Sequence, residues 1–157
     1  MTPAIEAARR AGIPVTVHEY AHDPGQRNFG REAANALGLD PRQVFKTLLV
    51  TRNGDPRRLS VAVVPVSGQL DLKAMAVACA SKRVEMADPQ LAERATGYVV
   101  GGISPLGQKR RLPTVIDQSA KQFDTIFVSG GRRGLDLGIA PADLIGLCDA
   151  VVAPVAR

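Results

Sequence analysis

VFKTLLV at residues 44–50 and LSVAVVPV at residues 59–66 are two apolar runs rich in β-branched side chains. This composition is typical of β-strands. Asn53 and Gly54 lie between the two runs, and this dipeptide is the strongest short-range signal for a tight hairpin turn. We therefore expect the two runs to pair as antiparallel strands.

Further helices and strands are predicted around this hairpin. Thr2 and Asp88 are suited to begin helices, and Gly12, Gly38 and Gly97 are suited to end them. The predicted helices cover residues 3–11, 31–38, 71–80, 88–97 and 140–150, and the other predicted strands or strand edges cover residues 13–20, 83–87, 114–120, 124–131 and 135–140. Because this order does not alternate regularly between strand and helix, a doubly wound nucleotide-binding fold is disfavoured. We predict one α+β (mixed α/β) domain over residues 1–157, built on a largely antiparallel mixed sheet.

Composition limits the classes of partner. The 157 residues, 45% of them hydrophobic, suffice for one core, and no run approaches the roughly 20 apolar residues of a membrane span. With no signal-peptide pattern at the start, we expect a cytoplasmic protein without a membrane partner. A net charge of +5 suggests a polyanionic ligand, and the 4% aromatic content disfavours stacking of bases on a sheet. Any nucleic acid is therefore expected to be held through its phosphates.

Motifs of the familiar hydrolases are missing from the sequence. It contains no G-x-S-x-G, P-loop, H-E-x-x-H or paired C-x-x-C pattern. His18 and His22 fall in a predicted strand and the turn after it, which favours a solvated or structural role over a metal site. Cys79 and Cys148 lie in apolar helical patterns, where buried structural thiols are expected. We therefore expect no metal, no cofactor and no nucleophile supplied by the protein.

Lys46 and a glycine-rich segment are the features most suggestive of a site. Lys46 lies inside an apolar strand, either with its ammonium group in solvent or pointing into a cleft to hold a phosphate or an oxyanion. Gly101 and Gly102 can bring backbone N–H groups close to an anionic oxygen, although an ordinary tight loop is an equal alternative. A third segment, FVSGGRRGLD at residues 127–136, again places glycine beside arginine, and a hairpin turn is the simpler interpretation there.

Four stretches of the sequence resemble the YbaK/EbsC family, most closely its Cys-tRNA(Pro) deacylase branch. They are FKTLLV at residues 45–50, VEMAD at 84–88, TGYVVGGISPLGQKRRLPTVID at 96–117 and IFVSGGRRGLDLGIAP at 126–141. The resemblance covers nearly the whole chain and is weakest over CDAVVAPVAR at its end. It implies a free-standing editing domain related to the insertion domain of prolyl-tRNA synthetases, with a partly barrel-like sheet surrounded by helices. The implied reaction is hydrolysis of mischarged Cys-tRNA(Pro).

The resemblance also implies roles for individual residues. Lys46 would hold the phosphate or sugar of the terminal adenosine. The backbone of one loop would receive the aminoacyl carbonyl and ester, and its residues are Gly101, Gly102, Ile103, Ser104 and Pro105. The pocket residues would be Tyr20, Phe29, Thr47, Ser129 and Asp136. Two basic clusters are candidates for the acceptor-stem phosphates, namely Lys109, Arg110 and Arg111, and the pair Arg132 and Arg133.

The implied chemistry explains why no nucleophile is recognisable. The thiol of the esterified cysteine would attack its own carbonyl and leave as a cyclic thiolactone, so that the protein need only position the reactants. The implied partners are the acceptor end of mischarged tRNA(Pro) and, transiently, prolyl-tRNA synthetase. Two alternatives stay open: a deacylase that removes Ala, Ser or Thr with an activated water, and a non-catalytic module that binds aminoacyl-tRNA.

Overall fold

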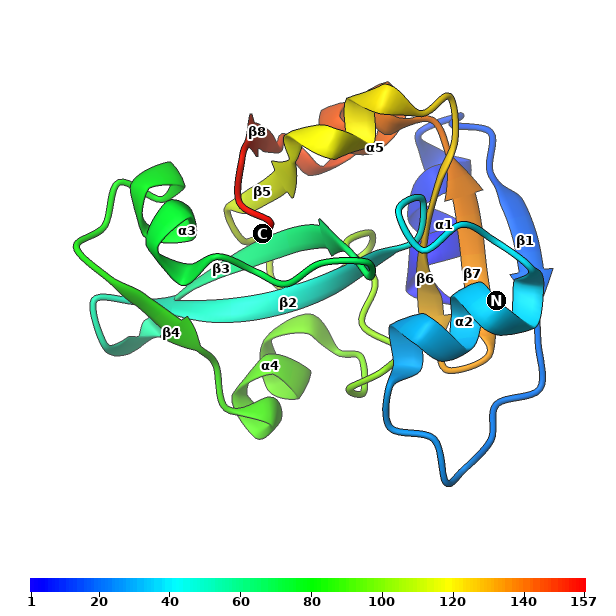
Figure 1. Ribbon diagram of the computed structural model, residues 1–157, viewed down its shortest axis with the longest axis horizontal. Helices are drawn as coiled ribbons and strands as arrows, with labels where there is room; N and C mark the ends of the chain where they lie inside the picture. The colour runs from blue at the N-terminus through cyan, green and yellow to red at the C-terminus, as the bar shows by residue number, and fades with distance from the viewer.

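A computed structural model, which describes residues 1–157, contains two β-sheets flanked by helices (Figure 1). The larger sheet has the strand order β4-β2-β3-β5-β8 and the smaller one the order β1-β7-β6. The strands are β1 (Thr16–Glu19), β2 (Phe45–Arg52), β3 (Asp55–Pro65), β4 (Val84–Met86), β5 (Thr114–Asp117), β6 (Ile126–Arg132), β7 (Leu135–Ile139) and β8 (Val151–Ala153). The helices are α1 (Pro3–Arg10), α2 (Phe29–Leu37), α3 (Leu72–Ala78), α4 (Pro89–Thr96) and α5 (Pro141–Cys148), with a 3₁₀-helix at Gln118–Gln122. No helix has the length and apolar character needed to cross a bilayer.

The predicted hairpin supplies the two longest strands of the larger sheet. β2 and β3 pair antiparallel from Phe45 opposite Pro65 to Arg52 opposite Asp55. Asn53 and Gly54 both have positive φ, at 54° and 70°, as a two-residue turn of the favoured hand requires. The sequence prediction of this hairpin is confirmed.

The sheets are largely antiparallel, as predicted, and two pairings are parallel. β1–β7, β6–β7, β2–β3 and β2–β4 are antiparallel, whereas β3–β5 and β5–β8 are parallel. The prediction of a strand over residues 114–120 was too long, because β5 ends at Asp117 and the chain turns into the 3₁₀-helix. β8, which pairs with β5 at the sheet edge, has no counterpart among the predicted strands.

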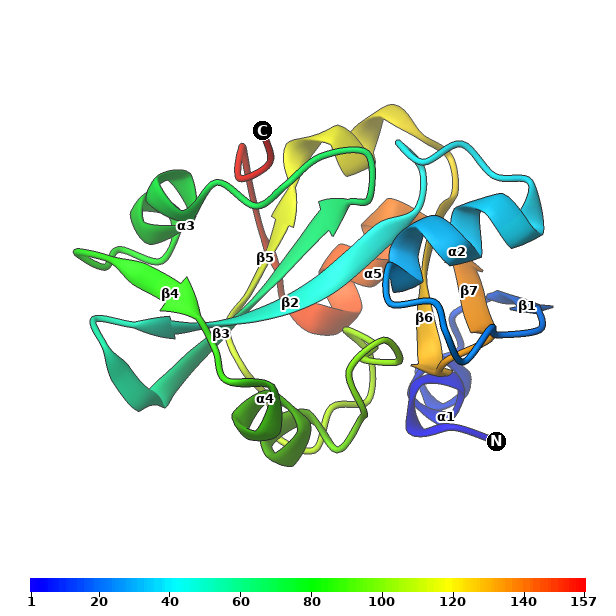
Figure 2. The same cartoon turned by 60° about the horizontal axis from the view of Figure 1, so that its bottom comes forward.

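The two sheets meet at one end of the β2–β3 hairpin. An isolated bridge between Val44 and Phe127 joins them, and one core cluster combines Phe45 of the larger sheet with Ile126 and Leu137 of the smaller one. α1 and α2 lie on opposite sides of the smaller sheet (Figures 1 and 2). The two sheets remain separate apart from this bridge and the shared core, and their junction is where the candidate site lies.

Asp117 fastens the C-terminal segment to the larger sheet. Its buried carboxylate accepts hydrogen bonds from the backbone N–H groups of Val155, at 3.0 Å, Ala156, at 2.9 Å, and Ser119, at 3.1 Å. Burial by itself would raise the pKa of Asp117, but these hydrogen bonds outweigh burial and lower the pKa below its ordinary value. The carboxylate is therefore a stabilising charge.

We expect Asp117→Asn to lower the free energy of unfolding by about 2 kcal/mol at pH 7, because an amide accepts these bonds more weakly than a carboxylate. A lowered pKa stabilises the folded state above the ordinary aspartate pKa and ceases to do so as the pH falls through the folded-state value. The deficit of the variant should therefore shrink on acidification. Urea unfolding of both proteins between pH 7 and pH 3 measures this, and a deficit that does not depend on pH would contradict it.

Candidate active site

A cavity of about 600 Å³ opens where the two sheets meet. Its walls come from β2, the start of α2, the loop after α4, and strands β6 and β7. The residues predicted to form the site that line this cavity are Tyr20, Phe29, Lys46, Thr47, Gly101, Ile103, Ser129 and Asp136. Segments far apart in the sequence thus contribute to one enclosure, large enough for a ligand of nucleoside size.

Lys46 lies on β2 and is one of the residues that line the cavity. The side chain is partly buried, and Nζ donates a hydrogen bond to the carbonyl oxygen of Gly68 at 3.1 Å. Because an ammonium group has three donors, two others stay available for a ligand. Burial lowers the pKa of Lys46, and the nearby charge of Arg31 lowers it further. Lys46 is thus a partly buried cation among the residues that line the cavity, and a backbone carbonyl group holds its ammonium group.

The glycine loop, residues 97–107, is held on both sides by polar contacts. The hydroxyl of Tyr98 donates to the carbonyl oxygen of Leu106 at 2.6 Å, which closes the loop on itself. Nε of Arg133, in the turn between β6 and β7, donates to the carbonyl oxygen of Val100 at 2.9 Å. The loop is therefore fixed against the smaller sheet before any ligand binds.

Gly101 lies close to the start of α2. Its φ is +89°, and a Cβ atom there would lie 2.7 Å from the ring of Phe29. No hydrogen bond within the chain uses the backbone N–H groups of Gly101 and Ile103, whereas the N–H of Gly102 donates to Val99 at 2.8 Å. Two backbone donors at the cavity wall are therefore free, and the third donor of the segment is used to close its own turn.

The other members of the predicted loop lie behind the cavity wall. A Cβ atom on Gly102 would lie 2.7 Å from Cα of Arg132, so this glycine permits close packing on the smaller sheet. Ser104 is fully buried, and Pro105 lines a separate cavity of about 200 Å³ and accepts a hydrogen bond from Sγ of Cys148 at 3.3 Å. The structure thus corrects the expectation that all five loop residues face one site, because the chain crosses from one cavity to the other within them.

Asp136 contributes a buried carboxyl group to the cavity. It lies on β7 between Ser129 on β6 and His18 on β1, and only 5% of it is exposed. Burial raises the pKa of Asp136 to about 7, with no hydrogen bond to oppose it. Burial, followed by the charge of Asp136, also raises the pKa of Tyr20 to about 12. The carboxyl group therefore gains and loses its proton near neutral pH.

Two hydroxyl groups complete the polar lining. The Oγ1 atom of Thr47 is buried and has no hydrogen-bond partner. The Oγ atom of Ser129 accepts a hydrogen bond from the N–H of Gly131 at 3.2 Å and keeps its own proton for another partner. An unpaired buried hydroxyl costs stability unless a ligand satisfies it.

The two predicted basic clusters differ in position. Arg132 is exposed and pairs with Glu19 at 3.6 Å, while the guanidinium group of Arg133 lies 4.7 Å from the centre of the Phe29 ring. Arg133 therefore supports the cavity wall as well as carrying charge. The other cluster lies beyond the cavity and is exposed, and its members are Lys109, Arg110 and Arg111.

Sequence reasoning missed the segment before α2. Nδ1 of His22 lies 2.6 Å from Oε1 of Glu32, and the other oxygen of Glu32 accepts a hydrogen bond from the N–H of Asp23 at 2.8 Å. These contacts fasten the segment that carries Arg27, which lines the cavity. A single arginine in a polar loop gives no sequence signal, because its place at the cavity depends on how α2 packs. No group of three or more His, Cys, Asp or Glu side chains in the structure is arranged to hold a metal ion.

Comparison with known proteins agrees with this geometry. Residues 24–147 match the family model of the aminoacyl-tRNA editing domain. The chain belongs to this family. Over 154 residues it is also 33% identical to EbsC of Enterococcus faecalis, which is named as a Cys-tRNA(Pro)/Cys-tRNA(Cys) deacylase, with 98% of this chain and 92% of the relative covered. The family resemblance seen in the sequence is thereby confirmed.

A segment similar to this chain also occurs within a longer synthetase. The proline–tRNA ligase of Citrifermentans bemidjiense is 29% identical over 118 residues, which cover 73% of this chain and 19% of the ligase. A solved structure described as a trans-editing enzyme for prolyl-tRNA synthetase superposes with a TM-score of 0.81 at 23% identity, over 98% of this chain and 92% of that one, and supports the fold. The family model and the similarity to EbsC together identify the chain as an aminoacyl-tRNA deacylase.

Gly101→Ala is expected to damage the site. The added Cβ would strike the Phe29 ring, and the φ of +89° is unfavourable for alanine, so we expect deacylation to fall at least about tenfold and stability to fall by about 1–3 kcal/mol. Gly146→Ala in α5 is the matched control, since a Cβ atom added there would have no neighbour within 4 Å. Single-turnover deacylation and thermal unfolding measure both. Equal activity of the two variants would show that the close approach at Gly101 is dispensable.

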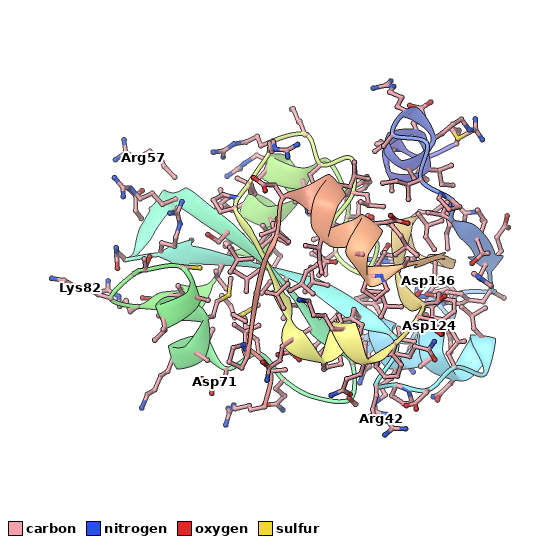
Figure 3. All side chains as sticks on the ribbon, turned by 90° about the horizontal axis from the view of Figure 1, so that it is seen from above. Arg42, Arg57, Asp71, Lys82, Asp124 and Asp136 are labelled. Carbon is pink, nitrogen blue, oxygen red and sulfur yellow. The ribbon has the colours of Figure 1, made fainter.

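Asp136→Asn is expected to stabilise the protein at neutral and higher pH. With its pKa raised to about 7, folded Asp136 holds a proton that the unfolded chain releases near pH 4, so stability falls as the pH rises from about 4 to 7. Asparagine removes this loss, which amounts to at most about 4 kcal/mol. Asp124→Asn, at an exposed site labelled with Asp136 in Figure 3, should have no such effect. Chemical unfolding from pH 5 to 8 compares them, and parallel curves for wild type and Asp136→Asn would refute the assignment.

Proposed function

We propose that this protein removes cysteine from mischarged Cys-tRNA(Pro), with the substrate's own thiol as the nucleophile. The observation that carries the proposal is the composition of the cavity. It contains two cations, a carboxyl group and free backbone N–H groups, but no cysteine or histidine lines it. Such a lining can bind and polarise an ester, and it offers neither a thiol nucleophile nor an imidazole base.

The polar groups match the parts of an aminoacyl ester. In the proposed complex, Lys46 holds the phosphate or sugar of the terminal adenosine, and the carbonyl oxygen of the ester faces the N–H groups of Gly101 and Ile103. The carboxyl group of Asp136 has no hydrogen-bond partner within the protein, and in the complex it accepts a hydrogen bond from the α-ammonium group of the amino acid. Tyr20, Phe29, Thr47 and Ser129 enclose the same volume.

The proposed reaction requires little from the protein beyond positioning. A thiol with a pKa near 8.5 is a few per cent ionised at neutral pH, and a well-held intramolecular attack gains an effective molarity of about 10⁵ M or more. The C–S bond forms as the C–O bond to the ribose breaks, and the thiol proton ends on the ribose oxygen. The products are a cyclic thiolactone and tRNA with a free 3′ end. The N–H groups of Gly101 and Ile103 stabilise the oxyanion that develops in between.

One observation favours a second candidate. A carboxyl group with a pKa of about 7, lining the same cavity as the unpaired hydroxyl of Thr47, is suited to activate a water molecule as a general base. A protein working in this way would hydrolyse Ala-, Ser- or Thr-tRNA without help from the amino-acid side chain.

The setting of the proposed reaction follows from its substrate. Mischarged tRNA(Pro) is formed by prolyl-tRNA synthetase, and a domain of this size has few side chains with which to identify a whole tRNA. We therefore propose that the protein acts in the cytoplasm, in a transient complex with the synthetase.

The decisive experiment incubates the purified protein with Cys-, Ser-, Ala- and Pro-tRNA(Pro). We expect release of cysteine at least about 100-fold faster than release of serine, because a hydroxyl group is a far weaker acid and needs a base to attack. The cyclic thiolactone should be detected by mass spectrometry as the first product. Rapid release of serine or alanine by hydrolysis would favour the second candidate instead.

The cysteines of the protein serve as an internal control of this chemistry. Neither Cys79 nor Cys148 lines the cavity, and burial raises the pKa of Cys148 to about 11. Cys79→Ser and Cys148→Ser should therefore retain cysteine release. A folded but inactive serine variant would mean that a thiol of the protein is the nucleophile.

A further inference from the structure

Two basic side chains line the candidate cavity near the start of α2, and a third lies close to one of them. Arg27, just before the helix, lines the cavity together with Lys46 on β2. Arg31 lies one turn further along α2, close enough to Lys46 for its charge to lower the pKa of the lysine. We call these three residues the entrance cations.

The entrance cations have no acidic partner in the protein. The seven ion pairs of the structure, all within 4.0 Å, include none of the three, although several other exposed arginines are paired, such as Arg42 with Asp40. Glu32, the acidic neighbour of Arg31 on α2, is instead bound to His22 and to the N–H of Asp23. Like charges held together without compensation are unfavourable, and an anionic ligand would remove that penalty.

The helix itself adds to the positive field. α2 begins at Phe29, which together with Gly30 lines the cavity, and the N-terminal end of a helix carries a partial positive charge. Its first backbone N–H groups therefore lie on the same side as the entrance cations. The combination of a helix N-terminus with unpaired arginine and lysine is a favourable environment for phosphate groups.

We propose that Arg27 and Arg31 bind the backbone phosphates of the single-stranded 3′ end of the RNA as its last nucleoside enters the cavity beside Lys46. This proposal rests on the proposed function, since it takes RNA as the ligand. It assigns the principal phosphate contacts to the segment before and within α2. The more obvious cluster, residues 109–111, follows the part of the glycine loop that faces the second cavity, where Arg110 and Arg111 line the wall.

The test uses an uncharged RNA minihelix that copies the acceptor stem and 3′ end of tRNA(Pro), with binding followed by fluorescence anisotropy from low to high salt. Each lost phosphate contact to single-stranded nucleic acid lowers the slope of log K against log salt by about 0.7. The double variant Arg27→Gln/Arg31→Gln should therefore lose about 1.4 from the slope and bind at least about tenfold more weakly at low salt. Thermal unfolding verifies that the variant is folded.

The matched control is Arg57→Gln/Lys82→Gln, which removes the same net charge from the end of the molecule opposite Asp136 (Figure 3). It should change the slope by less than a third as much. If both double variants lowered the slope equally, the effect would be explained by net charge alone, and the proposal would be overturned. The proposal would also be overturned if Arg110→Gln/Arg111→Gln lowered the slope of log K against log salt while Arg27→Gln/Arg31→Gln left it unchanged. Failure of the unaltered protein to bind the minihelix would overturn it as well.

Failure of the proposed reaction would be distinguishable from failure of this inference, because binding of the minihelix needs no ester. A protein that binds with the expected salt dependence but cleaves no aminoacyl-tRNA would keep the phosphate site and lose only the proposed chemistry. If Arg27→Gln/Arg31→Gln kept the wild-type salt slope while the protein released cysteine rapidly, the proposed reaction would stand and the phosphate site would be lost.

Discussion

The contact between Gly101 and the ring of Phe29 is the constraint on which the cavity depends. The missing side chain lets the glycine loop approach α2, and the guanidinium group of Arg133 covers the ring while its Nε holds the carbonyl of Val100. Three separate segments are thereby locked around one aromatic ring. The glycine loop is fixed although it has no regular secondary structure, and the unused N–H groups of Gly101 and Ile103 are held in place at no further cost when a ligand arrives.

The sequence was sufficient for most of the fold, because local signals and the tertiary structure agree there. Asn53 and Gly54 fix the central hairpin, since a turn with two positive φ values admits few other residues. β8 was not predictable in the same way. Its three residues pair with β5 only because Asp117 and the edge of the sheet receive the returning chain, and these are contacts between distant segments.

The candidate site was predictable in its members and less so in their orientation. The family pattern named residues 101–105 as one unit, but a chain that passes between two cavities must direct successive residues to different sides, and pattern alone does not reveal where it crosses. Arg27 and Arg31 were missed for a related reason. Charge that gathers from one helix and a neighbouring strand is invisible along the sequence, whereas a contiguous run such as residues 109–111 attracts attention wherever it lies.

The proposed attack by the substrate's own thiol also bears on selectivity. An apolar pocket separates amino acids of similar size by only about 10- to 200-fold, so excluding correctly charged proline by shape alone would be difficult. If the substrate's thiol breaks the ester, proline is spared for a chemical reason, since its side chain has no group that can attack the carbonyl. Serine is spared because its hydroxyl group is rarely ionised at neutral pH. The protein can then bind the cysteine, proline and serine esters in the same orientation, and the side chain of the amino acid determines which of them is released.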